Sequence, residues 1–447
     1  MPPPSPSRAP AFARRQIFFA LVAALLSGGM LRASDVPPSA NPLQPYRGLS
    51  VRGVDTSTLT GKVLAGYQGW FNCEGDGAGL GWTHWARNKA KPFAPGNVTV
   101  DLWPDISELT AGERFTTGFQ SGNGQPAEVF SSYNRETVLR HFRWMREYGI
   151  DGAFVQRFAN GVKNEVLRKH KDVVLAHCRE GANREGRTYA VMYDLSGLPA
   201  GGVAQVIEDW KRLRTQMRMG EDPAYLRPQG KPLVAVWGVG FAGEGRRYSL
   251  AECRTLIEFL KADGCSVMLG VPTGWRELKR DAAPAPALHD VLKLADVISP
   301  WTPGRYQNPQ GATRHGETYW QPDVVWCHEH SLDYLPVVFP GFSWHNLKPE
   351  AALGQIPRLK GGFLWSQFVA AKRAGAGMIY VAMFDEVDEG TAIFKCTNRP
   401  PGGASPFLTY EGLPSDYYLW LTGEGARLLR SERPVPADVA IPTYKAP

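Results

Sequence analysis

Eight short apolar runs recur along this chain of 447 residues, and longer amphipathic stretches separate them. The runs are rich in β-branched and aromatic residues and are too short for helices of ordinary length. Strands that are buried on both faces and alternate with helices form a parallel sheet. The predicted strands are Val63–Gly66, Ile150–Val155, Thr188–Tyr193, Pro232–Trp237, Ser266–Val271, Val297–Trp301, Leu335–Phe339 and Met378–Phe384.

Apolar residues at helical spacing fill the stretches between the runs. Eight strands that alternate with helices predict an α/β fold of the (β/α)8 TIM-barrel class, in a single catalytic domain. A doubly wound open sheet is the alternative, because periodicity does not show whether a sheet closes. The clearest predicted helices are Arg135–Tyr148, Ala204–Met217, Leu250–Ala262, Pro349–Ala374 and Tyr417–Arg430.

The first strand and the first helix are separated by the segment from Phe71 to Asn134. This segment is too long for an ordinary connection in a barrel. We therefore predict a long insertion after the first strand, on the face where barrel enzymes build their substrate clefts. The predicted domain spans 61–432, after a Pro/Ser-rich linker at 34–60 and before a C-terminal tail at 433–447.

The N-terminal segment has the pattern of a secretory signal peptide at 1–33. Arg14-Arg15 precede an apolar run from Ile17 to Leu26, and small residues follow near Ala33. The run is too short for a comfortable membrane span, although an uncleaved anchor is the alternative. Because the paired arginines loosely resemble a twin-arginine signal, we expect export to the periplasm or beyond, without stable membrane insertion after cleavage.

The charge of the chain argues against a nucleic-acid partner. The formal net charge of +7 falls to +3 when the signal peptide removes four arginines and no acids. No block of Lys and Arg rises above an ordinary solvated surface. The oligomeric state cannot be predicted from these features.

The cysteines and one histidine-rich segment raise the question of disulfides and metals. Cys253 and Cys265 flank one predicted helix, and an exported protein could join them in a disulfide. Cys327-His328-Glu329-His330 resembles a metal cluster but lacks a second ligand group at standard spacing. We predict no metal and no other cofactor.

The last apolar run ends in a crowd of acids, Asp385-Glu386-Val387-Asp388-Glu389. Crowded carboxylates raise one another's pKa, which suits chemistry that needs a protonated acid beside an ionised one. Glycoside hydrolysis is the main such chemistry. Residues three apart can face one side of a helical turn, so Glu386 and Glu389 are the predicted catalytic pair and Asp385 and Asp388 their supports.

Two alternative interpretations of the acidic run remain. A structural role, as a calcium site or a capping knot, is one of them, although the EF-hand spacing is absent. A metal-dependent α/β hydrolase that uses the acids together with His328 or His330 is the other.

Polar and aromatic residues recur at the carboxyl ends of the predicted strands. In a barrel these ends meet on one face, so the side chains would line a single cleft. Aromatic faces suit sugar rings, and amides and acids suit sugar hydroxyls. The predicted substrate-binding residues are Tyr67, Trp70, Gln156, Asp194, Trp237, Trp301, Arg305, Trp344 and Asn346.

Four segments resemble glycoside hydrolase families 71 and 99, and more narrowly the bacterial 71/99-like proteins. The segments are Gly66–Phe71, Asp101–Asp105, Ser299–Tyr306 and above all Glu386–Thr391, and the resemblance covers about residues 60–395. It implies a (β/α)8 barrel that hydrolyses O-glycosyl bonds. Family 99 enzymes act on α-mannosides, and family 71 enzymes act on α-1,3-glucan.

The family 99 motif reads Glu-Trp-His-Glu-Gly-Thr, and its glutamates fall on Glu386 and Glu389. The resemblance implies that Glu386 is the base, proposed to deprotonate the sugar 2-hydroxyl, and that Glu389 is the acid that protonates the leaving oxygen. Val387 and Asp388 replace the Trp and His of the motif. The sequence thus predicts an exported glycoside hydrolase with a carbohydrate substrate; a catalytically altered carbohydrate-binding protein on the same barrel is the alternative.

Overall fold

The computed structural model describes residues 1, 41–243 and 245–446. The chain divides into two units, Met1–Pro42 and Leu43–Pro447, and the second contains the fold described below. The predicted signal peptide after Met1, and the linker up to residue 40, lie outside the described residues. Within the described ranges, no helix has both the length and the apolar character that a membrane span requires.

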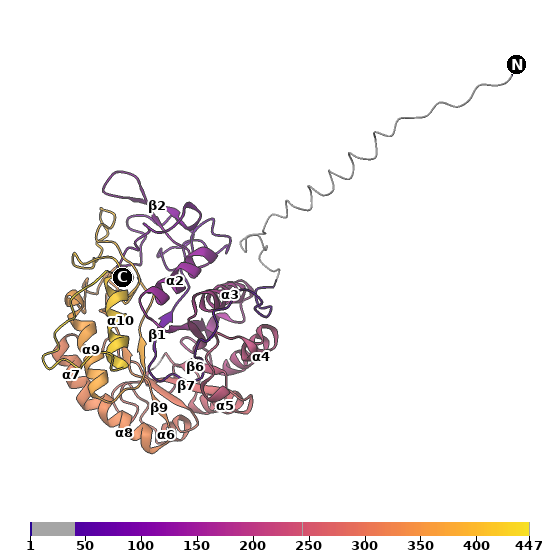
Figure 1. Cartoon of the computed structure of the whole chain (residues 1–447), viewed down its shortest axis with the longest axis vertical. Coiled ribbons are helices and arrows are strands. Elements are labelled where there is room, and N and C mark those ends of the chain that lie inside the picture. Colours follow the sequence, from indigo (N-terminus) through magenta and orange to yellow (C-terminus); the bar gives the residue numbers. More distant parts are fainter. Residues whose placement is uncertain (2–40, 244, 447) are drawn as a thin grey trace. The chain divides into compact units, whose positions relative to one another are not determined.

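A parallel sheet with strand order β10-β11-β1-β4-β5-β6-β7-β8-β9 forms the centre of the second unit (Figure 1). β9 pairs with β8 at one edge of this order, and β10 pairs with β11 at the other. Only Leu335 and Pro336 separate β9 from β10, so the two are halves of one strand and join both edges. The sheet therefore closes into the predicted eight-stranded barrel, and the open-sheet alternative is wrong. The strands are β1 Val63–Tyr67, β4 Gly152–Phe158, β5 Thr188–Asp194, β6 Leu233–Trp237, β7 Ser266–Val271, β8 Val297–Pro300, β9 Asp333–Tyr334, β10 Val337–Val338 and β11 Ile379–Val381.

Helices surround the barrel (Figure 1), and several of them begin at a side-chain cap. Asn134 accepts a hydrogen bond from the N–H of Thr137 at the start of α2, and Ser249 forms a capping box at the start of α5. The π-helical turn η5 (Gly316–Trp320) joins α7 to α8 in one continuous helical run. The α-helices are α2 Arg135–Glu147, α3 Glu165–Glu185, α4 Val203–Met217, α5 Leu250–Ala262, α6 Ala287–Leu292, α7 Pro309–His315, α8 Gln321–Glu329, α9 Gly362–Arg373 and α10 Tyr417–Leu429.

One predicted helix was too long at its N-terminal end. The sequence pattern placed a helix at Pro349–Ala374, but α9 begins only at Gly362. Gly354 and Gly361 have φ of 66° and 87°, in the left-handed region that ends helices. The apolar residues before Gly362 belong instead to a loop on the catalytic side of the barrel.

The predicted insertion after β1 is present and carries its own small core. It contains an antiparallel hairpin, β2 (Phe115–Gln120) and β3 (Pro126–Val129). Phe93 stacks on Trp103 with ring centroids 5.5 Å apart. These aromatic residues are buried and pack together with the rest of the hydrophobic core.

The six cysteines are free and buried, so the predicted Cys253–Cys265 disulfide is wrong. Cys253 lies near the start of α5, and Cys265 follows its end. At about 1.5 Å of rise per residue, the helix separates them by roughly 18 Å. Disulfides require Cα atoms within about 7 Å.

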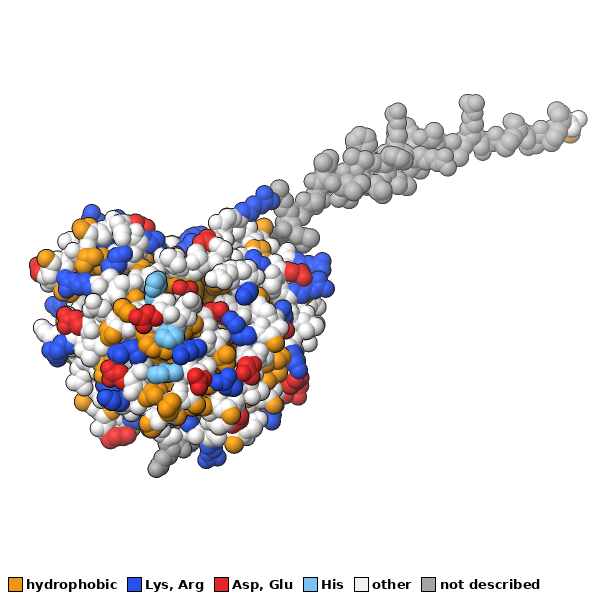
Figure 2. Space-filling view, turned by 90° about the horizontal axis from the view of Figure 1, so that it is seen from below, with side chains coloured by type: hydrophobic (Ala, Val, Ile, Leu, Met, Phe, Trp, Pro, Cys, Tyr) orange, Lys and Arg blue, Asp and Glu red, His pale blue; other side chains and the backbone are white. Residues whose placement is uncertain are grey.

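Acidic and basic side chains are interspersed on the face of the molecule shown in Figure 2. A buried ion cluster contrasts with this surface. Arg157, which is 2% exposed, donates to Asp209 and, at 2.8 Å, to Asp172. Burial opposes ionisation of Asp209, but Arg157 outweighs it and lowers the pKa of Asp209 to about 2. The cluster connects β4 to α3 and α4.

Removing one acid from this cluster should destabilise the barrel. Asp209→Ala leaves the Arg157 guanidinium buried and undercompensated, so we expect the free energy of unfolding to fall by about 3–5 kcal/mol. Urea denaturation followed by circular dichroism measures it. Glu208→Ala, at a neighbouring residue of α4 that is 70% exposed, is the matched control and should change it by less than about 0.5 kcal/mol. A loss below about 1 kcal/mol in D209A would contradict a stabilising role.

Candidate active site

Asp385 closes the seam between the last and first strands of the barrel. Its carboxylate accepts the backbone N–H groups of Gln68 at 2.8 Å and Gly69 at 2.9 Å, directly after β1. Burial nevertheless raises the pKa of Asp385 to about 7. Because both its oxygens are engaged by backbone, Asp385 supports the site, as predicted for it, and does not face the mouth.

Glu386 is 4% exposed and is held by two side-chain donors. Gln68 donates through Nε2 to one carboxylate oxygen, and Thr391 donates through Oγ1 to the other, both at 2.5 Å. Burial, followed by the charge of Glu389, raises the pKa of Glu386 well above its ordinary value. The two donors favour the ionised form, so Glu386 is the member of the pair equipped to carry a negative charge.

Glu389 has a different environment. It is half-buried, and among the described residues no group donates a hydrogen bond to its carboxylate. Burial, followed by the charge of Asp388, raises its pKa to about 7, although Lys348 opposes the shift. A carboxyl group that still holds a proton near neutral pH can act as a general acid. The two glutamates interact, so they titrate as a pair.

The insertion and the loop between β10 and α9 fix the backbone of the acidic loop. The N–H of Asp101 donates to the carbonyl of Val387 at 3.0 Å, and the N–H of Ser343 donates to the carbonyl of Glu389 at 2.9 Å. Arg358 donates to the carbonyl of Gly390 at 2.8 Å. Gly390 has φ of 61°, and a Cβ there would lie 2.9 Å from the backbone of Ser343, so this position requires glycine.

His84 brings an imidazole from the insertion to the acidic loop. Its Nδ1 lies 3.0 Å from Oδ2 of Asp388, and its ring stacks on Trp70 at 3.9 Å with an angle of 3°. His84 has φ of 62°, a left-handed conformation that costs a non-glycine residue energy and persists where contacts enforce it. Its side chain is 36% exposed, so the imidazole that Asp388 holds is also accessible to solvent.

Four of the predicted binding residues gather around the glutamates. Gln156 donates to the Tyr380 hydroxyl at 3.0 Å, and Trp301 packs edge-to-face against Trp237 at 5.6 Å. The charge of Asp194 contributes to the raised pKa of Glu389, which places Asp194 at the same mouth. Gln156, Asp194, Trp237 and Trp301 thus remain candidates for substrate contact.

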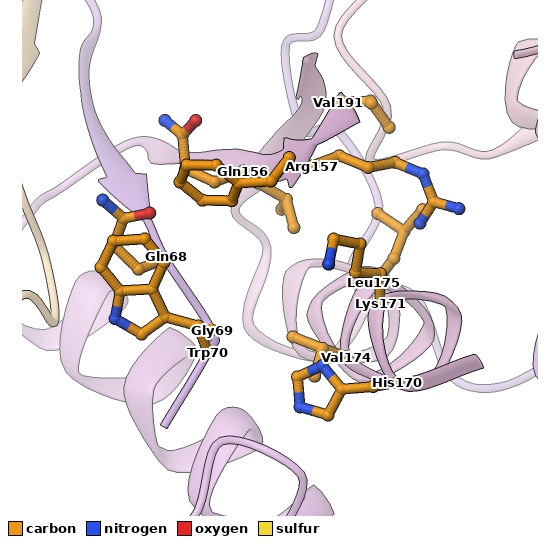
Figure 3. A pocket seen from close by; sticks show the side chains of 12 residues that line it. Gln68, Gly69, Trp70, Gln156, Arg157, His170, Lys171, Val174, Leu175 and Val191 are labelled. Carbon is orange, nitrogen blue, oxygen red and sulfur yellow. The ribbon is translucent and has the colours of Figure 1, made fainter. Parts of the chain in front are cut away.

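A small cavity of about 30 Å³ lies behind this mouth, between the strand ends and α3 (Figure 3). Gln68, Trp70 and Gln156 line one side of it, and Lys171 extends into it from α3. Its volume suits one or two water molecules rather than a sugar. The cavity separates the mouth from the helix layer.

Other predicted binding residues have structural roles. Tyr67 is fully buried, and its hydroxyl lies 2.9 Å from Nδ1 of His141 in the core. Asn346 is buried and donates to the carbonyls of Val100 and Pro406. Neither side chain is available to a substrate.

The remaining three side chains are occupied by contacts within the protein. Trp70 has both faces covered, by His84 and by Phe158 at 5.0 Å, so it cannot stack on a sugar. Trp344 lies under the ammonium group of Lys348 at 4.3 Å. Arg305 pairs with Asp281 at 2.7 Å and lines a separate pocket.

Sequence reasoning missed Gln68, His84, Tyr380 and Thr391 as site residues. Gln68 and Thr391 stand within the segments that carry the family resemblance, and that position was the available signal. His84 lies in an insertion without periodic pattern, so only the fold brings it to Asp388.

The metal-dependent alternative lacks its ligands. Among residues 41–243 and 245–446, no three His, Cys, Asp or Glu side chains are grouped to hold one ion. His328 and His330 lie at the end of α8, which leads into the amino end of the seventh barrel strand. The acidic loop follows the carboxyl end of β11, at the opposite end of the barrel.

Comparison with solved structures confirms the predicted resemblance at the level of the fold. An endo-alpha-mannosidase of glycoside hydrolase family 99 from Bacteroides thetaiotaomicron matches with a TM-score of 0.59 and 18% identity, over 83% of this chain and 98% of that one. Its complex with BIS-TRIS-propane matches with 0.59 and 17%, over 84% and 99%. A glycoside hydrolase-like protein matches with 0.50 and 13%, over 86% and 99%. No protein-family model and no curated protein matches the sequence.

The raised pKa of Glu389 predicts a pH dependence of stability. Between pH 4.5 and about 7 the folded protein keeps a proton that the unfolded chain has released, so the free energy of unfolding falls as pH rises through this window. Glu389→Gln removes this contribution. From about pH 4.5 to about pH 8 the variant should therefore gain stability relative to wild type, on the order of 2 kcal/mol.

Thermal and urea unfolding at a series of pH values measure the difference. Glu208→Gln, a carboxylate 70% exposed, is the control and should follow wild type at every pH. A difference between E389Q and wild type that does not change with pH would show that Glu389 has an ordinary pKa in the folded protein.

Proposed function

We propose that this protein hydrolyses glycosidic bonds of a poly- or oligosaccharide, with Glu389 as general acid and Glu386 as base. The observation that carries the proposal is the unequal pair itself. Burial raises the pKa of both acids, but Glu386 receives two hydrogen bonds that oppose the rise and favour its ionised form, whereas Glu389 receives none from the described residues. One ionised and one protonated acid at the mouth of a barrel is the arrangement that glycoside hydrolysis requires.

Each step uses a group whose environment fits it. Glu389 donates its proton to the leaving oxygen as the bond to the anomeric carbon breaks. Glu386, fixed by Gln68 and Thr391, accepts a proton from the attacking group. By the family 99 resemblance this group is the sugar 2-hydroxyl; a water molecule is the ordinary alternative. Half-buried Trp237 and Trp301 provide aromatic surface for sugar rings.

The family neighbour guides the choice of first substrate. Because the solved structure with the same fold is described as an endo-alpha-mannosidase, α-mannosides are the first glycans to test. We also propose export through the N-terminal signal, and a catalytic domain bounded at 61–432.

A binding protein without catalysis is the second candidate, motivated by Val387 and Asp388. The structure gives both residues roles that leave the acids in place. Val387 is fully buried and offers its carbonyl to Asp101, and Asp388 holds His84. The departures from the motif therefore do not remove the catalytic pair.

Glu389→Gln should lower kcat on a natural glycan by about 10²–10⁴-fold while the fold persists. An aryl glycoside with an activated leaving group needs little protonation, so its loss should be much smaller. Glu386→Gln should lower kcat on both substrates. Wild-type kcat/KM should decline above about pH 7, as Glu389 loses its proton.

Reducing ends, product mass and anomeric configuration by NMR provide the measurements. Glu350→Gln, an exposed glutamate, is the matched control and should retain wild-type rates. Glycan binding by calorimetry without any release of reducing ends would instead favour the binding protein.

His84 should contribute to substrate binding through Nε2, because Asp388 engages Nδ1. Asparagine tolerates the left-handed backbone, so His84→Asn removes the ring with little strain. We expect KM to rise about tenfold, as for one lost hydrogen bond in a closed site.

The melting temperature of H84N should fall, because the buried Asp388 loses its imidazole partner, and Asp388→Asn should give a similar rise in KM. The KM of the double variant should be close to that of either single variant, because the two residues act as one unit. A fall in melting temperature with KM unchanged would show that the pair is merely structural.

A further inference from the structure

A second, larger pocket lies at the loop that follows β8. It measures about 460 Å³, within the range of small-molecule and sugar sites. Arg280, Arg305 and Arg314 line it from three segments: the loop after β7, the loop after β8, and α7. Among the described residues that line it, none is acidic.

The three arginines are not equivalent. Arg305 is neutralised by Asp281 at 2.7 Å, and Asp281 also accepts the N–H groups of Thr273 and Gly274. Arg305 is therefore fixed to the loop after β7. Arg314 is exposed and has no hydrogen bond or ion pair with any described residue.

Arg280 is positioned by an aromatic ring. It donates to the Tyr319 hydroxyl at 2.7 Å, and its guanidinium lies 5.1 Å from the centre of that ring. Its backbone has φ of 60°, in the left-handed region. Arg280 and Arg314 thus leave two uncompensated positive charges facing one pocket.

His315 adds no charge to this pocket. Burial is the largest cause that lowers its pKa to about 3; the charges of Arg280 and Arg305 act in the same direction, and the charge of Asp281 opposes them. The imidazole therefore stays neutral, and the positive charge of the pocket comes from guanidinium groups alone. Guanidinium groups bind sulfate and carboxylate through paired donors.

The remaining lining suits a sugar better than a free ion. Tyr319 provides an aromatic edge, and Gln307, Asn308 and Thr318 provide amide and hydroxyl groups. The pocket also follows Trp301 of the mouth by only a few residues of chain, and Thr273 donates to the carbonyl of Trp301 at 2.7 Å. It therefore belongs to the same face of the barrel as the acids.

The two charged regions have opposite signs. An anionic sugar at the mouth would meet no compensating guanidinium group there, and it would face the ionised Glu386 of the proposed mechanism. The same sugar in the arginine pocket would be attracted. If a glycan carried an anionic substituent several sugars from the cleaved bond, binding of that substituent in the arginine pocket would fix which glycosidic bond lies at the acids.

We propose that the arginine pocket is a distal subsite for an anionic sugar, carrying a sulfate ester or a carboxylate, and that the substrate is an acidic glycan. The proposal rests on the proposed function, because it treats the pocket and the mouth as parts of one cleft.

The test measures binding without turnover. Full-length E389Q is titrated calorimetrically with three matched oligosaccharides: sulfated, carboxylated and neutral. The sulfated or the carboxylated one should bind about tenfold more tightly than the neutral one, and the preferred member of the two identifies the anion. Arg314→Gln and Arg280→Gln, each in the E389Q background, should weaken anionic binding about fivefold, and the pair about 25-fold.

Arg254→Gln is the matched control, because it removes one positive charge from the outer side of α5. It should leave binding unchanged. Raising the ionic strength should weaken anionic but not neutral binding. A melting curve of each variant confirms that the protein is folded.

Equal binding of anionic and neutral glycans, or full binding in the double arginine variant, would overturn the proposal. So would inorganic sulfate binding as tightly as the sulfated glycan, which would identify a simple ion site. Failure of the hydrolase proposal would be seen separately, as wild-type protein that binds the glycan in this way and releases no reducing ends.

Discussion

The structure depends on how it accommodates four neighbouring carboxylates at the seam of a barrel. A buried carboxylate is costly unless donors or an opposite charge compensate it. Different groups compensate three of these acids. Backbone N–H groups donate to Asp385, side-chain donors bind Glu386, and an imidazole contacts Asp388. Glu389 alone is left without a donor among the described residues, so nothing opposes the rise of its pKa except the charge of Lys348. One run of sequence thus produces four chemically distinct groups.

The insertion after β1 is the framework that makes this arrangement possible. Asp101 joins two loops at once, because its N–H contacts the acidic loop and its carboxylate accepts the N–H groups of His345 and Asn346 at 2.7 and 2.8 Å. Ser343 also donates to that carboxylate. Burial raises the pKa of Asp101, so the donors are needed to hold it. The same insertion supplies His84, and it is therefore part of the site as well as its support.

The sequence predicts the barrel well and the cleft only in part. Apolar runs mark strands because a parallel barrel buries both faces, and this rule located all eight strands, including the one divided at Leu335-Pro336. It could not reveal that Tyr67 points into the core, since the orientation of one residue depends on the packing around it. Nor could it reveal that Asn346 donates a hydrogen bond to the carbonyl of Val100 in the insertion. Tertiary contacts determine whether a side chain at a strand end lies in the cleft or in the core. A local sequence pattern does not contain that information.

The division of charge on the catalytic face follows from the same constraint. Carboxylates crowded enough to share a proton also repel any anion, so recognition of an acidic glycan has to occur away from the cleaved bond. The loop after β8 meets this requirement, because Asp281 anchors Arg305 while Arg280 and Arg314 stay available. On this proposal, the acids would cleave the bond and the arginines, on the loops after β7 and β8 and on α7, would hold the glycan in position.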